Sequence, residues 1–270
     1  MKPGAVQTTW LEFSDGWETV ENEVIEEVSL CLQVNGAPWF GMMCSPTMQR
    51  ELAVGFLYNE GIIDGLSQVA EVSLNEAESC VDVWLNFNIS RPQAVSRTTG
   101  CGGGLTLAEE EGMLEPVQSD LRMDPNLLLE NFKKLQVAGG LYSRARGVHA
   151  AGLGRDEEML VTVEDVGRHN ALDKIAGYCL MNDVDPKGTV LYSTGRISSE
   201  MLKKAVRLGC PIVASRTSPT SNSVEGATRW GVTLVGYARR GSMRVYTYPE
   251  RLGFSGESSS AGRTSRRDDG

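Results

Sequence analysis

From residue 159 the chain runs through MLVTV (159–163), GRHNALDKIAGYCL (167–180), TVLYST (189–194), SSEMLKKAVRLG (198–209), PIVAS (211–215), SNSVEGATRWG (221–231), GVTLVGYA (231–238) and MRVYTY (243–248). Short β-rich runs alternate here with segments of helical length and composition. Such alternation predicts a layered α/β sheet, largely parallel, with an antiparallel pair at its end. We therefore expect residues 121–252 to form a C-terminal α/β core.

Residues 1–120 carry more local signals, which predict a smaller N-terminal α+β portion. The runs 24–34 and 38–44 flank Asn35-Gly36, a strong hairpin signal. Ser45-Pro46 has the pattern of a helix start, with proline at the first helical position. Apolar and polar residues then alternate over 81–89, as expected of a strand with one buried face.

The remaining segments are predicted as one helix and two irregular stretches. Asp124-Pro125 opens a helix with Leu128, Phe132 and Leu135 on one face. Glycine and small residues at 96–104 interrupt the pattern, so we expect a mobile loop near 95–120 that ends the N-terminal portion. Residues 253–270 have almost no apolar side chains and are predicted to be disordered.

The composition excludes several classes of protein. Hydrophobic residues make up 41% of the 270 residues, and the formal net charge is −9. A negative charge of this size argues against general nucleic-acid binding, which depends on lysine and arginine. The sequence has no apolar run of about 18 residues and no signal-peptide pattern at its start, so we expect a cytoplasmic protein.

Cys101 is the first candidate for chemistry. The six cysteines form no Cys-x-x-Cys spacing, and in a reducing compartment most cysteines are small buried hydrophobic residues. Cys101 differs because four glycines surround it in Thr99-Gly100-Cys101-Gly102-Gly103-Gly104. An exposed thiol on such a tether can visit two partners in turn, as a sulfur carrier must. The alternative is a turn that happens to contain a cysteine.

A second candidate is EDVGRHNALDK (164–174), where a predicted strand ends and a helix begins. Ligand groups often lie at such junctions. The candidates are Asp165, Arg168 and His169, together with His149, the other histidine of the chain. The alternatives are that Asp165 caps the helix and that the histidines are satisfied core residues.

Three further segments have the composition of an anion site. Two strand-to-helix junctions place hydroxyls, an arginine and free backbone amides at a helix start, which suits a phosphate. Their candidates are Gly195, Arg196, Thr217 and Ser218. A turn with two arginines and an aromatic residue can stack a base and pair with its phosphates. Its residues are Tyr237, Ala238, Arg239, Arg240, Gly241 and Ser242. The alternatives are ordinary helix caps and a solvated hairpin tip.

Taken together, these residues resemble the formate dehydrogenase accessory protein family of the FdhD type, sulfurtransferases of molybdenum-cofactor maturation. The resemblance covers nearly the whole chain, and EDVGRHNALDK is its most specific motif. The other matching segments are Ser45-Pro46, LAVGFL (52–57), EGII (60–63), TGCG (99–102), HAA (149–151), LVGY (234–237) and VYT (245–247).

The resemblance implies a cytidine-deaminase-like α/β sandwich without deaminase chemistry. It implies transfer of persulfide sulfur from a cysteine desulfurase to the bis-guanine-dinucleotide molybdenum cofactor before its insertion into formate dehydrogenase. By position, Cys101 forms the persulfide and Tyr237 to Ser242 bind the cofactor. It also implies a cytoplasmic homodimer. Many family members have a second cysteine where this chain has Gly104, so any local sulfur relay depends on Cys101 alone.

A zinc deaminase and a cofactor chaperone are the two alternative functions. A zinc deaminase needs a Pro-Cys-x-x-Cys motif and a His-x-Glu motif, and the sequence contains neither. We therefore expect no protein-ligated metal. The second alternative is a non-enzymatic chaperone that only holds the molybdenum cofactor for formate dehydrogenase. It would use the arginine turn equally well, and Cys101 would be incidental.

Overall fold

A computed structural model describes residues 4–92, 95–97, 105–107, 114–138, 140–239 and 241–255. Its main element is a six-stranded sheet in the order β10-β9-β11-β12-β13-β14. The strands are β9 (His149–Arg155), β10 (Glu158–Asp165), β11 (Val190–Ser193), β12 (Ile212–Ser215), β13 (Thr233–Arg239) and β14 (Ser242–Val245). The α/β class expected from the alternating segments is confirmed, and the cytidine-deaminase-like description stays a prediction.

Helices cover both faces of this sheet. The helices α4 (Arg168–Met181), α5 (Ser199–Arg207) and α6 (Ser221–Arg229) lie on one face, and α2 (Pro125–Ala138) lies on the other. Alternate strand residues separate the two cores: Leu191 packs with the first group, and Val190 and Tyr192 pack with α2. The burial of both faces explains why the central strands β11 (VLYS) and β12 (IVAS) are mostly apolar and buried along their whole length.

The expectation of a largely parallel sheet was wrong. Only β11–β12 and β12–β13 are parallel among the five pairings of this sheet, and the other three are antiparallel. Strand β9 was not predicted from the sequence. It lies between β10 and β11 and runs antiparallel to both. Its HAAGLGR sequence is poor in β-formers. The glycines fit there because a Cβ at Gly152 would lie 2.9 Å from the Val161 carbonyl oxygen, and a Cβ at Gly154 would lie 2.8 Å from the Tyr192 ring.

A four-stranded sheet in the order β4-β3-β6-β5 forms the N-terminal part. Its strands are β3 (Val28–Val34), β4 (Ala37–Cys44), β5 (Val69–Leu74) and β6 (Cys80–Leu85), with the short helix η1 (Leu66–Gln68) before β5. The predicted hairpin is confirmed: Asn35 and Gly36 have φ of 52° and 76° and join β3 to β4. Helix α1 (Gln49–Asn59) covers the inner face of this sheet.

The sequence predicted that helix α1 begins at Ser45-Pro46, but it begins at Gln49. Met48 adopts a left-handed φ of 53° just before it. The Ser45 N–H instead donates to the carboxylate of Asp165, the last residue of β10, and the Ser45 hydroxyl accepts from the Val166 amide. A long-range contact therefore overrides the local helix-start signal.

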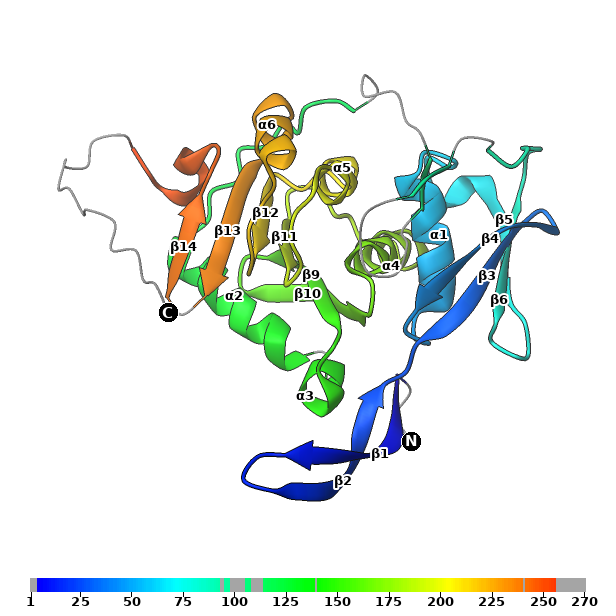
Figure 1. Cartoon of the computed structure of the whole chain (residues 1–270). Helices are drawn as coiled ribbons and strands as arrows, with labels where there is room; N and C mark the ends of the chain where they lie inside the picture. Colours follow the sequence, from blue (N-terminus) through cyan, green and yellow to red (C-terminus); the bar gives the residue numbers. More distant parts are fainter. Residues whose placement is uncertain are drawn as a thin grey trace.

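A hairpin of β1 (Ala5–Phe13) and β2 (Trp17–Ile25) precedes this sheet and projects away from both sheets (Figure 1). This hairpin was not predicted from the sequence. Arg144 of the short helix α3 (Leu141–Ala145) holds the base of this hairpin through a 2.8 Å hydrogen bond from its Nε to Glu23.

The short strands β7 (Val95–Arg97) and β8 (Leu105–Leu107) pair with each other. A loop was expected near 95–120, so these two segments differ from the expectation. Helix η2 (Pro249–Leu252) follows β14. The tail predicted to be disordered comprises residues 253–270, of which those from 256 onward lie outside the described residues.

Helices α1 and α4 lie side by side between the two sheets (Figure 1). Two glycines make this close approach possible. A Cβ at Gly55 would overlap the carbonyl oxygen of Asp173, and a Cβ at Gly177 would overlap that of Glu51. The helix pair therefore joins the two parts of the molecule through backbone-to-backbone contact.

We expect Gly55→Ala to destabilise the protein although alanine is the better helix former. Helix propensity favours alanine by about 1 kcal/mol, but overpacking a tight interface costs about 1–3 kcal/mol or more. Because the clash is with backbone, it cannot be relieved by a side-chain rotation. Urea denaturation measures the loss. Gly65→Ala is the control, since a Cβ there meets nothing within 4 Å, and equal stability of the two variants would contradict the prediction.

Candidate functional site

Several of the segments that stand out in the sequence and that the structure describes meet at one edge of the six-stranded sheet. The parallel strands β11, β12 and β13 end together there. Residues 194–197 and 216–220 follow β11 and β12, and residues 237–239 form the last part of β13. The Ser215 hydroxyl donates to the Gly195 carbonyl at 2.6 Å, and the Tyr237 amide donates to the Thr217 carbonyl at 3.0 Å. We call this row the carboxyl edge. It is the usual position of ligand sites in α/β sheets.

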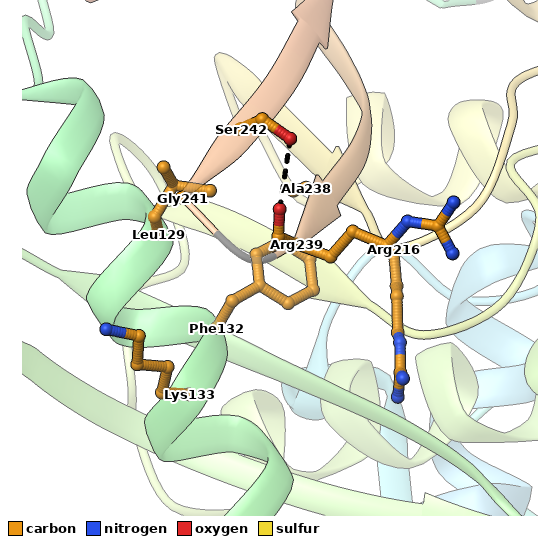
Figure 2. Close-up of a pocket in the computed structure, with 8 residues that line it drawn as sticks. All are labelled: Leu129, Phe132, Lys133, Arg216, Ala238, Arg239, Gly241 and Ser242. Atoms are coloured by element: carbon orange, nitrogen blue, oxygen red, sulfur yellow. Dashed lines mark hydrogen bonds between the residues drawn. The ribbon is translucent and has the colours of Figure 1, made fainter.

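A cavity of about 510 Å³ lies at this edge, between α2 and the turn from β13 to β14 (Figure 2). The lining residues are Leu129, Phe132, Lys133, Arg216, Ala238, Arg239, Gly241 and Ser242. The Ser242 hydroxyl donates to the Arg239 carbonyl at 3.1 Å and closes the turn. The volume is in the range of pockets that hold small molecules.

Three cations from three different elements surround this cavity. Lys133 belongs to α2, Arg216 follows β12, and Arg239 ends β13. Leu129 and the buried ring of Phe132 form the apolar wall. Since the chain as a whole carries a net charge of −9, three cations that line one cavity mark a local basic site. Cations beside an apolar wall suit a phosphate-bearing ligand with a flat ring.

The backbone between β13 and β14 is irregular, and this irregularity shapes the turn. The register shifts between Gly236 and Arg239, and Tyr237 has a left-handed φ of 52°. Gly241, with φ of 76°, then permits the tight return. The Tyr237 ring is not part of the cavity lining: the Arg244 guanidinium lies 4.2 Å from its centroid. The sequence predicted that a base stacks on the aromatic residue of this turn. A base on the Tyr237 ring would therefore compete with the Arg244 guanidinium for that ring.

The structure brings together only part of the predicted cofactor-binding set. Ala238, Arg239, Gly241 and Ser242 line the cavity. Thr217, Ser218, Gly195 and Arg196 lie on the same edge but outside the cavity lining. Arg240 lies outside the described residues. Leu129, Phe132 and Lys133 were not predicted as site residues, because the helix pattern indicates which face of α2 is buried but not which of its residues line a cavity.

His149, Arg168 and Gly195 form a second cluster on the carboxyl edge. A Cβ at Gly195 would lie 3.0 Å from the Arg168 Cβ and 3.3 Å from His149 Nδ1. Burial, and then the positive charge of Arg168, lowers the pKa of His149. Burial, helped by Lys204 and Arg168, lowers the pKa of His169 to about 3. Both imidazoles are therefore neutral at physiological pH and add no charge to that of Arg168.

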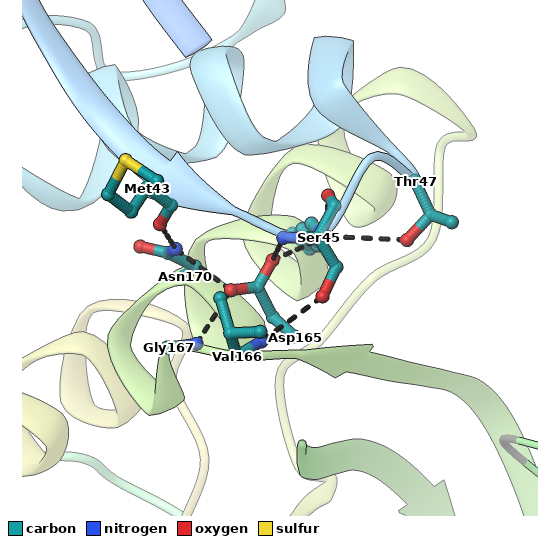
Figure 3. Close-up of polar contacts among 8 residues, drawn as sticks. Met43, Ser45, Thr47, Asp165, Val166, Gly167 and Asn170 are labelled. Carbon is teal, nitrogen blue, oxygen red and sulfur yellow. Dashed lines mark hydrogen bonds and ion pairs between the residues drawn. The ribbon is translucent and has the colours of Figure 1, made fainter. Parts of the chain in front are cut away.

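Asp165 lies in a buried polar network at the start of α4 (Figure 3). Its Oδ2 forms an ion pair with Lys174 Nζ at 2.6 Å and accepts from the Ser45 amide at 3.1 Å. Its Oδ1 accepts from the Gly167 amide at 2.7 Å and from Asn170 Nδ2 at 2.9 Å. Both oxygens are thus used within the protein, and they tie the start of α4 to the end of β4. The first residue before α4 is Gly167, so Asp165 is not the N-cap.

Cys101 lies outside the described residues, within the connection 98–104 between β7 and β8. Its role as the reactive thiol stays a prediction. Three of the other cysteines are buried, and their pKa values are raised by burial: Cys44 to about 12, Cys179 to about 11 and Cys210 to about 12. These three thiols are shielded from solvent and remain protonated. Cys31 and Cys80 are partly exposed.

Metal-binding clusters and membrane-spanning helices are both absent from the part of the chain that the structure describes. No cluster of three or more His, Cys, Asp or Glu residues in it has an arrangement suited to a metal ion. None of the helices described is both long enough and apolar enough to span a membrane.

The chain is similar to known proteins in both sequence and fold. The model of the FdhD/NarQ family matches residues 25–253. Among curated proteins, the chain is 32% identical to the sulfur carrier protein FdhD of Bacillus subtilis, covering 93% of this chain and 98% of that protein. It is 33% identical to the protein of that name from Bacillus pumilus, covering 86% and 90%. A crystal structure from Desulfotalea psychrophila, described as a formate dehydrogenase accessory protein, superposes with a TM-score of 0.77 at 25% identity and covers 93% of this chain and all of that one.

Proposed function

The chain belongs to the FdhD/NarQ family, and we propose from this that it is a sulfur carrier that serves formate dehydrogenase. The relatives named sulfur carrier protein match it over nearly its whole length, which supports the same role here. We further propose that it works in the cytoplasm as a homodimer.

We propose that Cys101 takes the sulfur from a cysteine desulfurase. The Cys101 thiolate attacks the outer sulfur of the desulfurase persulfide, and the desulfurase cysteine leaves as a thiolate. The exchange moves one sulfur atom with no net oxidation or reduction. This makes the protein a sulfurtransferase, and it makes Cys101 the residue on which the transfer depends.

We propose that the recipient is the bis-guanine-dinucleotide molybdenum cofactor, bound as a client at the carboxyl edge. The observation that carries this proposal is the cavity formed by Lys133, Arg216 and Arg239 beside Phe132. Its cations suit the pyrophosphate of a dinucleotide, and its apolar wall suits the flat base. Four of the lining residues, Ala238, Arg239, Gly241 and Ser242, also belong to the segment that the sequence resemblance assigns to cofactor binding.

Guanosine diphosphate, which carries the base and the pyrophosphate, is the probe for this site. We expect Arg216→Ala combined with Arg239→Ala to weaken its binding about tenfold or more, because each charge-assisted bond contributes about 1.5–3 kcal/mol. Isothermal titration calorimetry measures the change. The control combines Arg91→Ala with Arg155→Ala, two exposed arginines outside the cavity lining, and removes the same charge. Equal loss in both double variants would mean that only net charge matters, and the cavity would not be the site.

A further inference from the structure

Two partly exposed cysteines lie side by side on the outer face of the four-stranded sheet. Cys31 of β3 and Cys80 of β6 are register partners in a parallel pair. The residues that flank them, Leu30, Leu32 and Val81, are fully buried against α1. Because side chains alternate along a strand, both thiols point away from α1 on the same face.

The two thiols are close enough to react with each other. Neighbouring strands lie about 4.7–4.9 Å apart, within the Cα separation of about 4.4–6.8 Å that a disulfide spans. Burial, followed by a hydrogen bond with Cys31, raises the pKa of Cys80 well above its usual value. Cys80 therefore keeps its proton and donates to the sulfur of Cys31. In this arrangement Cys31 attacks first, and Cys80 is the adjacent second thiol.

The pair is also open to a small reactant on the β4 side. The register partner of Cys31 on that side is Gly41, which has no side chain. A Cβ there would meet only Ser29 Oγ at 3.7 Å and the Leu30 carbonyl at 3.9 Å. The buried cysteines Cys44, Cys179 and Cys210 have no such access.

We propose that Cys31 and Cys80 are a redox-active dithiol that reduces sulfane sulfur to sulfide. The inference rests on the proposed function for its purpose, since sulfane sulfur carried as a persulfide must gain two electrons to be delivered as sulfide. The loop around Cys101 has no second cysteine to supply them, because Gly104 stands at that position. The Cys31–Cys80 pair supplies these electrons from another part of the protein.

The reaction balances without any further reactant. The Cys31 thiolate attacks the sulfane sulfur of a persulfide, and the thiol of that persulfide leaves and takes up a proton. The Cys80 sulfur then attacks Cys31 and passes its proton to the departing sulfur, so that a disulfide forms and the sulfane sulfur leaves as hydrogen sulfide. One persulfide and two thiols thus give one thiol, one disulfide and one hydrogen sulfide. A cellular thiol reductant restores the pair by thiol–disulfide exchange.

Inorganic tetrasulfide is the probe, and the full-length Cys101→Ala variant is the protein, so that the reaction cannot start at Cys101. We expect one sulfide released for each Cys31–Cys80 disulfide, which peptide mapping after alkylation identifies. Cys31→Ser and Cys80→Ser, each added to this variant, should reduce sulfide release about tenfold or more, since a single thiol cannot close a disulfide within the chain. Adding Cys179→Ala, a buried cysteine, should leave the release unchanged.

Two results would overturn the inference: undiminished sulfide release in both serine variants, or a lasting sulfur adduct on Cys31 or Cys80 with no cross-link. Thermal unfolding of each variant shows whether a loss of reaction reflects a loss of fold. Because Cys101 is absent from this assay, failure here leaves the proposed sulfur-carrier role intact. Failure of Cys101 to accept sulfur from a desulfurase would in turn leave the dithiol reaction unaffected.

Discussion

The Cys101→Ala variant is expected to gain no sulfur atom when it is incubated with a cysteine desulfurase and cysteine, whereas the wild-type protein gains one. The attacking species in persulfide transfer is a thiolate, and alanine cannot provide one. Intact-mass measurement under non-reducing conditions detects the adduct. In cells that lack the native protein, the variant should restore no formate dehydrogenase activity above background.

Cys179→Ala is the control for this experiment, because burial raises the pKa of Cys179 to about 11 and keeps it protonated. It should accept sulfur and restore activity as the wild type does. If Cys101→Ala still restores formate dehydrogenase activity, Cys101 is incidental, and the protein acts only by holding the molybdenum cofactor. Guanosine diphosphate binding by the same variant shows that its cavity remains intact.

The parts of the fold that were predictable depend on local interactions. The hairpin at Asn35-Gly36 follows from the left-handed backbone that these two residues accept easily. Helix α2 follows from Asp124, whose carboxylate accepts from the Asn126 amide at 2.6 Å. Strand β9 was missed because its small residues form a strand only where Met159 and Tyr192 pack against its glycines. That packing is a property of the assembled sheet.

The residues of the candidate site were likewise predictable only where local sequence brings them together. Arg239, Gly241 and Ser242 were predictable because a single turn carries them. Lys133 was not, since its contribution depends on where α2 docks across the sheet. Asp165 stood out as a possible ligand or helix cap, yet its partners include Ser45, which is 120 residues away in the sequence. No local pattern distinguishes a ligand carboxylate from one that joins two distant segments.

Lys174→Met tests whether this network holds the molecule together. The side chains of Lys174 and Asp165 are both fully buried, with Nζ and Oδ2 2.6 Å apart. Removal of the lysine leaves the Asp165 carboxylate buried without a countercharge, which costs about 3–5 kcal/mol of unfolding free energy. Urea denaturation measures the loss. Lys187→Met is the control, because Lys187 is exposed and surface changes usually stay within about 0.5 kcal/mol.

A second substitution separates charge from packing. Asp165→Asn combined with Lys174→Met removes both charges, while the amide oxygen can still accept from Gly167 and Asn170. The double variant should therefore be more stable than Lys174→Met alone, since no uncompensated charge remains buried. If the two substitutions instead destabilise additively, the cost of Lys174→Met comes from lost packing. The ion pair would then not be what joins the end of β4 to the start of α4.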